Sequence, residues 1–250
     1  MSRQSLKIGW LYPDLMSIYG DRGNVIVLQQ RSEWREIETK VLPLTLGSTA
    51  EELAACDLIF MGGAQDRQQR IVADDIQNKA GTLKKMIDDG VPGLYICGAY
   101  QFLGKYYKEA DGTIINGLDI LDLYTESPGE SEKRLIGNTL AISDLLQAPL
   151  VGFENHGGRT YLGPRVNPLA QIKKGFGNNG LDGTEGAIYR QSIGTYFHGP
   201  ILPKNPQLAD FLLQKALEHK YQSEVRLEPL DDSLSDQARF IIAKRLGVEL

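Results

Sequence analysis

The sequence contains few cysteines, few histidines and no long apolar run. Among its 250 residues only Cys56 and Cys97 are cysteines, which is too few for a disulfide framework. The chain does not open with a charged and then apolar signal segment, and no apolar stretch approaches the roughly 18 residues that a membrane span requires. We therefore expect a cytoplasmic protein whose thiols stay reduced.

Motifs that bind charged ligands are also scarce. The formal net charge is −5 and no basic stripe is present, so no nucleic-acid partner is expected. No grouping of histidine and cysteine has zinc-ligand spacing, and we predict no metal site. No G-x-x-x-x-G-K-[ST] loop occurs, so an ATP-driven reaction would need its nucleotide on another polypeptide. Residues 175–180 match the dinucleotide fingerprint, but turn residues follow where a helix should begin, so we interpret them as a loop.

Strand and helix patterns alternate over the first 110 residues. This alternation predicts βαβ units and an α/β fold with a doubly wound sheet. Strands are predicted over residues 6–12, 37–44, 56–61 and 94–96, and helices over residues 25–36 with Asn24 as the N-cap, 66–89 and 100–107.

Short strands and turns replace this alternation after about residue 112. Segments such as 151–153, 186–189 and 193–197 predict antiparallel additions to the sheet. A last helix is predicted over residues 207–219. We divide the chain into one domain, residues 1–221, and a C-terminal helical tail, residues 222–250, with an amphipathic helix near residues 235–246.

Cys97 is the candidate nucleophile. It ends an apolar strand and is followed by the small residues Gly98 and Ala99, as a sharp and strained strand-to-helix turn requires. At the amino end of a helix the positive end of the dipole lowers the pKa of a thiol. The alternative is a buried structural cysteine, which is how we interpret Cys56, inside an apolar strand.

Thiol chemistry needs a base, and the chain offers three histidines. His198 follows the predicted strand 193–197 and would lie at a sheet edge, where ligand sites form. His156, in a glycine-rich loop, is a rival base, whereas His219 ends a helix and complements its dipole. Gly63, after the strand 56–61, and Gly98 could offer backbone N–H groups to an oxyanion. These residues together fit a nucleophilic acyl-transfer site.

Four segments carry a family resemblance. Residues 19–24, 96–104, 152–159 and 194–203 resemble the class I, thiol-type glutamine amidotransferases, specifically the cobyric-acid-synthase-like group and, within it, the glutaminase subunits of lipid II isoglutaminyl synthases. The resemblance implies a flavodoxin-like sheet. It also implies that the Cys97 thiolate attacks the side-chain amide of glutamine and that His198 protonates the departing ammonia and then activates water.

The resemblance also implies the substrate-binding residues. Gly63 and Gly98 would hold the tetrahedral oxyanion, and Gln101 matches a family position that contacts the substrate. Arg134 matches the family's substrate-binding arginine, whose guanidinium suits the α-carboxylate of glutamine.

The implied partner is a MurT-like synthetase of the Mur-ligase family. It would hold ATP and magnesium, with no cofactor in this chain, and would amidate the D-glutamate α-carboxyl of the lipid II stem peptide at the inner face of the membrane. Pro200 stands where many class I members carry an acid, so we hypothesise that the partner supplies that acid and that the isolated chain hydrolyses glutamine weakly. Two alternatives stay open: a corrinoid acceptor, as in cobyric acid synthesis, and a catalytically silent module that binds a partner.

Overall fold

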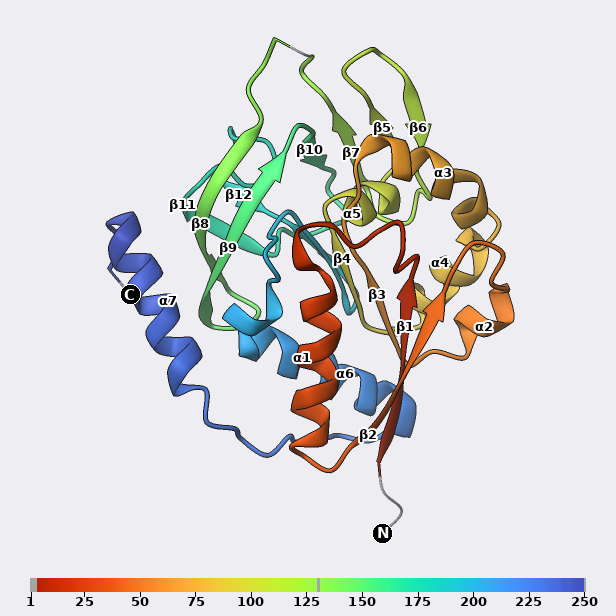
Figure 1. The fold of residues 1–250 in the computed structure, drawn as a ribbon, viewed down its shortest axis with the longest axis vertical. Helices are drawn as coiled ribbons and strands as arrows, with labels where there is room; N and C mark the ends of the chain where they lie inside the picture. Colours follow the sequence, from red (N-terminus) through yellow and green to blue (C-terminus); the bar gives the residue numbers. More distant parts are fainter. Residues whose placement is uncertain (1–3, 130, 250) are drawn as a thin grey trace.

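A central mixed sheet organises the chain. The computed structural model describes residues 4–129 and 131–249 (Figure 1). Five neighbouring strands are parallel, and the sixth, an edge strand formed by residues 187–189, is antiparallel to its neighbour. The spatial order is β13 (Ala187–Tyr189), β14 (Ser192–Thr195), β4 (Gly93–Ile96), β3 (Leu58–Met61), β1 (Ser5–Leu11) and β2 (Glu38–Leu44).

This order confirms the predicted flavodoxin-like, doubly wound sheet, with one correction. The segment 193–197 was expected among the antiparallel additions, but β14 pairs in parallel with β4. All four residues of β14 are buried, as are those of β3 and β4, which is typical of parallel strands covered on both faces.

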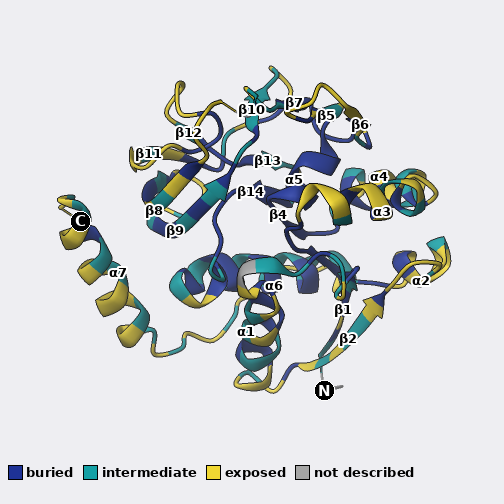
Figure 2. Cartoon of the chain, turned by 45° about the horizontal axis from the view of Figure 1, so that its top comes forward, coloured by how far each residue is buried: buried dark blue, intermediate teal, exposed yellow. Residues whose placement is uncertain are grey.

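Helices cover both faces of the sheet. The helices α1 (Arg22–Glu33) and α6 (Pro206–Tyr221) contact each other on one side. On the other side lie α3 (Asp66–Gln77), α4 (Ala80–Asp88) and α5 (Gly98–Leu103), with α2 (Ala50–Ala54) against α4 (Figure 2).

Two further four-stranded sheets confirm the predicted antiparallel additions. In each of them most neighbouring strands run antiparallel. One has the order β10 (Arg159–Leu162), β7 (Leu123–Glu126), β5 (Tyr106–Lys108) and β6 (Ile114–Asn116), and the other β12 (Thr184–Glu185), β11 (Ala170–Lys174), β8 (Leu135–Ser143) and β9 (Ala148–His156).

Three predicted helices differ from those observed. Asn24 does not cap α1 but lies inside it, because its buried Oδ1 accepts a hydrogen bond from the distant Leu202 N–H at 2.9 Å. The predicted helix 66–89 is two helices, α3 and α4, that are interrupted at Asn78 and Lys79. The predicted helix 100–107 begins earlier and ends at Leu103, since the chain then forms β5.

The C-terminal helix α7 (Ser233–Leu246) forms as predicted. It buries Ala243 against Leu140 of β8 and Val151 of β9. The chain that leads to it is fixed by Arg31, whose guanidinium pairs with Asp232 at 2.6 Å and with Asp210 of α6 at 2.7 Å. The division of the chain after residue 221 stays a prediction. Across the described ranges, no helix combines the length and hydropathy needed to span a bilayer.

β14 packs closely against α5, at Gly194 and Tyr100. A Cβ added at Gly194 would lie 2.0 Å from Cδ2 of the fully buried Tyr100. We expect Gly194→Ala to lower the free energy of unfolding by about 1–3 kcal/mol, measured by urea denaturation, because the ring has nowhere to move.

Gly137, on β8, provides the matched control because a Cβ there meets nothing within 4 Å. Gly137→Ala should change the free energy of unfolding by no more than about 0.5 kcal/mol. Equal losses in the two variants would contradict the packing argument.

Candidate active site

Cys97 lies at a strained turn between β4 and α5. Its backbone has φ 51° and ψ −105°, a conformation that residues with a Cβ rarely adopt. The turn is held on both sides, since Cys97 N–H donates to Thr195 O at 2.8 Å and Gln101 N–H donates to Cys97 O at 2.9 Å. The predicted strand–turn–helix around this cysteine is therefore confirmed.

His198, which follows β14, and Cys97 both lie next to Gly63. Because β4 and β14 are parallel neighbours, Cys97 and His198 both lie at the carboxyl edge of the sheet. A Cβ at Gly63 would be 3.0 Å from Cε1 of His198 and 3.3 Å from Cβ of Cys97. These contacts are tighter than most Cβ contacts, so the residues after β3, β4 and β14 lie close together at Gly63.

The imidazole of His198 is fully buried and its pKa is perturbed. Burial alone would lower the pKa of His198, but its interactions with Cys97 and with the Asp21 carboxylate raise it to about 9. His198 therefore carries its proton at neutral pH and loses it only as the pH rises through about 9. The arrangement places a cation beside the sulfur.

Asp21 is a site residue that sequence reasoning missed. Its side chain is fully buried, with Oδ1 3.8 Å from Nδ1 of His198 and Oδ2 accepting the Gly63 N–H at 2.6 Å. One carboxylate of this chain thus contacts both the imidazole and the glycine that separates it from Cys97. The imidazole already has a carboxylate beside it before any partner binds.

Pro200, which stands where many class I members carry an acid, packs instead against the segment that contains Asp21. A Cβ added at Gly23 would lie 2.4 Å from Cγ of Pro200, so the loop after His198 packs directly on the first turn of α1. This contact brings Asp21, the N-cap residue of α1, next to the imidazole. The segment 19–24 carried the family resemblance, but nothing in its pattern assigned a role to Asp21.

The rival base, His156, has a different environment. Its ring stacks on Tyr196 with centroids 3.6 Å apart, and its Nδ1 lies 2.8 Å from the Gly158 carbonyl oxygen. Burial lowers the pKa of His156, which the nearby Glu154 carboxylate only partly opposes. His156 is thus held as a neutral ring that supports the pocket wall.

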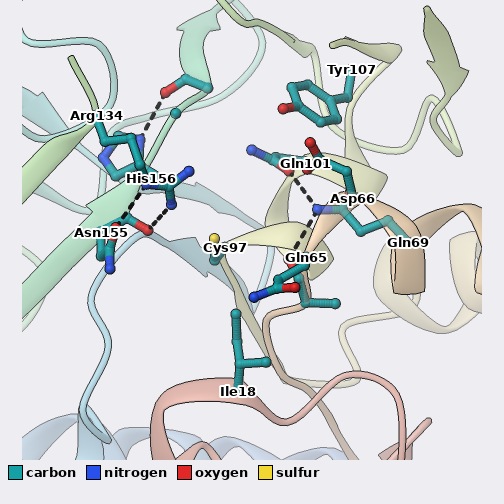
Figure 3. A pocket seen from close by; sticks show the side chains of 13 residues that line it. Ile18, Gln65, Asp66, Gln69, Cys97, Gln101, Tyr107, Arg134, Asn155 and His156 are labelled. Carbon is teal, nitrogen blue, oxygen red and sulfur yellow. Dashed lines mark hydrogen bonds between the residues drawn. The ribbon is translucent and has the colours of Figure 1, made fainter. Parts of the chain in front are cut away.

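A cavity of ≈ 380 Å³ opens above Cys97. Figure 3 shows the cysteine between two walls, one with Arg134, Asn155 and His156 and the other with residues of α3 and with Gln101. The Arg134 guanidinium donates to Oδ1 and O of Asn155 at 2.9 and 2.8 Å. Of the predicted site residues, Cys97, Arg134 and Gln101 line the cavity.

Gly63, Gly98 and His198 are not among the described residues that line the cavity. Gly98 is the first residue of α5, where backbone N–H groups have no partner within the helix. In this structure the Gly63 N–H is directed at Asp21, so it would have to turn to reach an oxyanion above Cys97.

Three other predictions concern residues outside the cavity. Cys56 is buried, as expected of a core cysteine, and burial raises the pKa of its thiol to about 11. His219 lies in the last turn of α6, as predicted. The loop 175–180 is followed by a turn rather than a helix, and its Phe176 and Gly177 N–H groups donate to the Glu154 carboxylate.

The sheet order and the cysteine turn define a class I glutamine amidotransferase fold. Residues 7–206 match the CobB/CobQ-like glutamine amidotransferase domain, and the chain belongs to this family of glutamine amidotransferases. Solved structures support the fold: a glutamine amidotransferase (TM-score 0.58, 16% identity, 84% of this chain and 98% of that chain) and PurLQS from Thermotoga maritima (TM-score 0.56, 14% identity, 88% and 100%).

The chain is also similar to two subunits over nearly their whole length. It is 44% identical to the lipid II isoglutaminyl synthase (glutamine-hydrolyzing) subunit GatD of Staphylococcus aureus (strain N315), over 93% of this chain and 92% of that protein. It is 38% identical to the subunit of the same name from Streptococcus pneumoniae, over 93% and 88%. Similarity to the probable cobyric acid synthase of Methanothermobacter thermautotrophicus is 29%, over 90% of this chain and 47% of that protein.

The charge coupling around His198 can be tested by NMR titration. In the unmodified chain the imidazole of His198 should titrate near pH 9, whereas His156 should titrate below its usual range. Cys97→Ala and Asp21→Asn should each lower the pKa of His198, because each removes a group that favours the protonated imidazole while burial remains. An unchanged His198 titration in both variants would show that neither group interacts with the imidazole.

Proposed function

We propose that this chain is the glutamine-hydrolysing subunit of a lipid II isoglutaminyl synthase. The observation that carries the chemistry is the convergence of Cys97 and His198 on Gly63, at the floor of a cavity whose wall bears Arg134. The similarity to the GatD subunits, at 44% and 38% identity over nearly their whole length, supports the choice of acceptor.

In the first half-reaction the Cys97 thiolate attacks the side-chain carbonyl carbon of glutamine. The C–S bond forms while the carbonyl π electrons move to oxygen. His198, protonated at neutral pH, donates its proton to the amide nitrogen as the C–N bond breaks and ammonia leaves. A γ-glutamyl thioester on Cys97 remains.

In the second half-reaction water cleaves the thioester. His198, now neutral, removes a proton from water as its oxygen attacks the thioester carbon, and glutamate leaves while Cys97 recovers its thiolate. The Asp21 carboxylate, 3.8 Å from Nδ1, stabilises the imidazolium and holds the ring. An acid supplied by the partner stays a prediction. The two assignments differ in the activity expected of the isolated chain. If Asp21 is the acid, the isolated chain hydrolyses glutamine, whereas an acid from the partner would leave the isolated chain with weak activity.

Backbone N–H groups would stabilise the tetrahedral intermediates. Gly98 N–H is at the amino end of α5, directly after the nucleophile, where the helix dipole also favours negative charge. Gly63 N–H would join it after turning away from Asp21. The Gly63 contribution therefore requires a local rearrangement when the substrate or the partner binds.

Arg134 and Gln101 would bind the substrate. Arg134 is the only arginine or lysine among the described residues that line the cavity, and its guanidinium can donate two parallel hydrogen bonds to the oxygens of a carboxylate. The Gln101 amide is held by Tyr196 and by α3 on the opposite wall. A glutamine with its α-carboxylate on Arg134 would extend its side-chain amide toward Cys97.

The released ammonia would pass to a MurT-like synthetase of the Mur-ligase family. That partner would activate the D-glutamate α-carboxyl of lipid II with ATP and magnesium, and ammonia would displace the activating group to give D-isoglutamine. Because lipid II is anchored in the bilayer, we place the reaction in the cytoplasm, near the inner face of the membrane. This chain itself would need no cofactor.

Two alternatives differ in measurable ways. A corrinoid acceptor is less well supported, since the match covers 47% of the cobyric acid synthase but 92% and 88% of the GatD subunits. A catalytically silent partner-binding module would not require Cys97 and His198 to lie together at Gly63. It predicts no ammonia release from glutamine, even with the synthetase present.

The proposal is tested by amidation of lipid II with the co-purified synthetase, ATP and glutamine. Cys97→Ser should reduce glutamine-dependent amidation at least about 1000-fold, because the nucleophile is lost. Ammonium chloride should restore amidation by the same complex, since the synthetase needs only ammonia. Glutamine-dependent amidation that survives Cys97→Ser would overturn the assignment, and a failure of ammonium to rescue would show that the variant disrupts the complex.

The role of Arg134 is tested by a substitution that keeps its charge. Arg134→Lys should raise KM for glutamine about tenfold with a smaller change in kcat, because a lysine loses the paired hydrogen bonds to a carboxylate. Arg165→Lys, at a side chain that is 73% exposed and outside the cavity, is the control and should leave KM unchanged. Equal KM values in the two variants would remove Arg134 from the substrate site.

A further inference from the structure

We propose that Gln69, on the first turns of α3, is a positioning residue for glutamine hydrolysis. Its side-chain amide joins the loop after β3, the start of α5 and the substrate-facing Gln101. This inference rests on the proposed glutaminase chemistry and adds to it a residue that does not itself react.

Two hydrogen bonds define the position of the Gln69 side chain, which is 2% exposed. Its Nε2 donates to the Ala64 carbonyl oxygen at 3.3 Å and to Oε1 of Gln101 at 3.2 Å (Figure 3). An amide nitrogen has two hydrogens, so these acceptors use both. Gln101 in turn donates to the hydroxyl of Tyr196 at 3.2 Å, which fixes the orientation of its amide.

The third contact is with Gly98. A Cβ at Gly98 would lie 2.7 Å from Nε2 of Gln69 and 3.3 Å from the backbone N of Ala64. The Gln69 amide therefore occupies the space that a side chain at residue 98 would need. It lies directly against the residue whose N–H follows the nucleophile.

These contacts predict a role in catalysis and not only in folding. Oxyanion donors act only when they are held in place before the charge develops. Gln69 holds the loop at Ala64 and packs on Gly98, so its loss would let the Gly98 N–H and the loop after Gly63 drift from the positions that hydrolysis needs. The attack by Cys97 on a saturated carbon, which creates no oxyanion, would not depend on Gln69.

Gln77 offers a matched control on the same helix. Its Nε2 likewise makes two hydrogen bonds, in this case to the backbone carbonyl oxygens of Asn116 and Gly117, at 3.2 and 2.9 Å. These bonds lie outside the cavity. Gln69→Met and Gln77→Met therefore remove the same kind of interaction from one helix, at the site and away from it.

The experiment compares ammonia release from glutamine with alkylation of Cys97 by iodoacetamide, in the full-length chain bound to its synthetase. Gln69→Met should lower kcat about 10- to 100-fold, with KM changed less than about threefold, because a displaced donor costs less than a deleted one. The rate of Cys97 alkylation, followed by mass spectrometry, should stay within about twofold of the unmodified chain, since alkylation forms no oxyanion. Gln77→Met should leave both rates unchanged.

Each other outcome decides the question. If Gln69→Met lowers kcat no more than Gln77→Met, or slows alkylation as much as hydrolysis, Gln69 has only a structural role. Gln69→Glu provides a second variant of the same shape, and it should also lower kcat because it cannot donate to both acceptors. If Cys97→Ser still releases ammonia, the proposed function fails and not merely the role of Gln69.

Discussion

The site depends on the backbone of Cys97, which is held at a positive φ. A non-glycine residue in that conformation costs about 1–3 kcal/mol, so the surrounding structure must impose it. The hydrogen bond from Cys97 N–H to Thr195 O joins the turn to the neighbouring strand, and α5 begins at once because Gly98 has no side chain to clash with Gln69. The sulfur is thereby presented at the carboxyl edge of the sheet, where the cavity opens.

A second constraint is the burial of two charged side chains, Asp21 and His198, close to Cys97. Segments far apart in the sequence meet at Gly63, and two of the groups there, Asp21 and His198, are fully buried. A buried imidazole would ordinarily be neutral, but interactions with Cys97 and Asp21 raise the pKa of His198 and keep it protonated. The same carboxylate also holds the Gly63 N–H, so the orientation of the base and that of the oxyanion loop are linked.

The sequence was most informative where the pattern is local. Strand patterns that alternate with helix patterns predicted the first four parallel strands. A cysteine followed by small residues predicted the turn at Cys97. The parallel pairing of β14 and the internal position of Asn24 depend on contacts with distant residues, which no local period encodes. Asp21 escaped prediction for the same reason: contacts of distant residues, such as Pro200 with Gly23, bring it to the imidazole.

The proposed hydrolysis requires a covalent bond between the substrate and the sulfur of Cys97. The most direct measurement is an acid quench during turnover with glutamine, followed by mass spectrometry of the peptides that contain Cys97 and Cys56. A γ-glutamyl thioester should be found on Cys97 alone and should disappear as glutamine is exhausted. Continued hydrolysis with no thioester on Cys97, or with the adduct on another residue, would contradict the account.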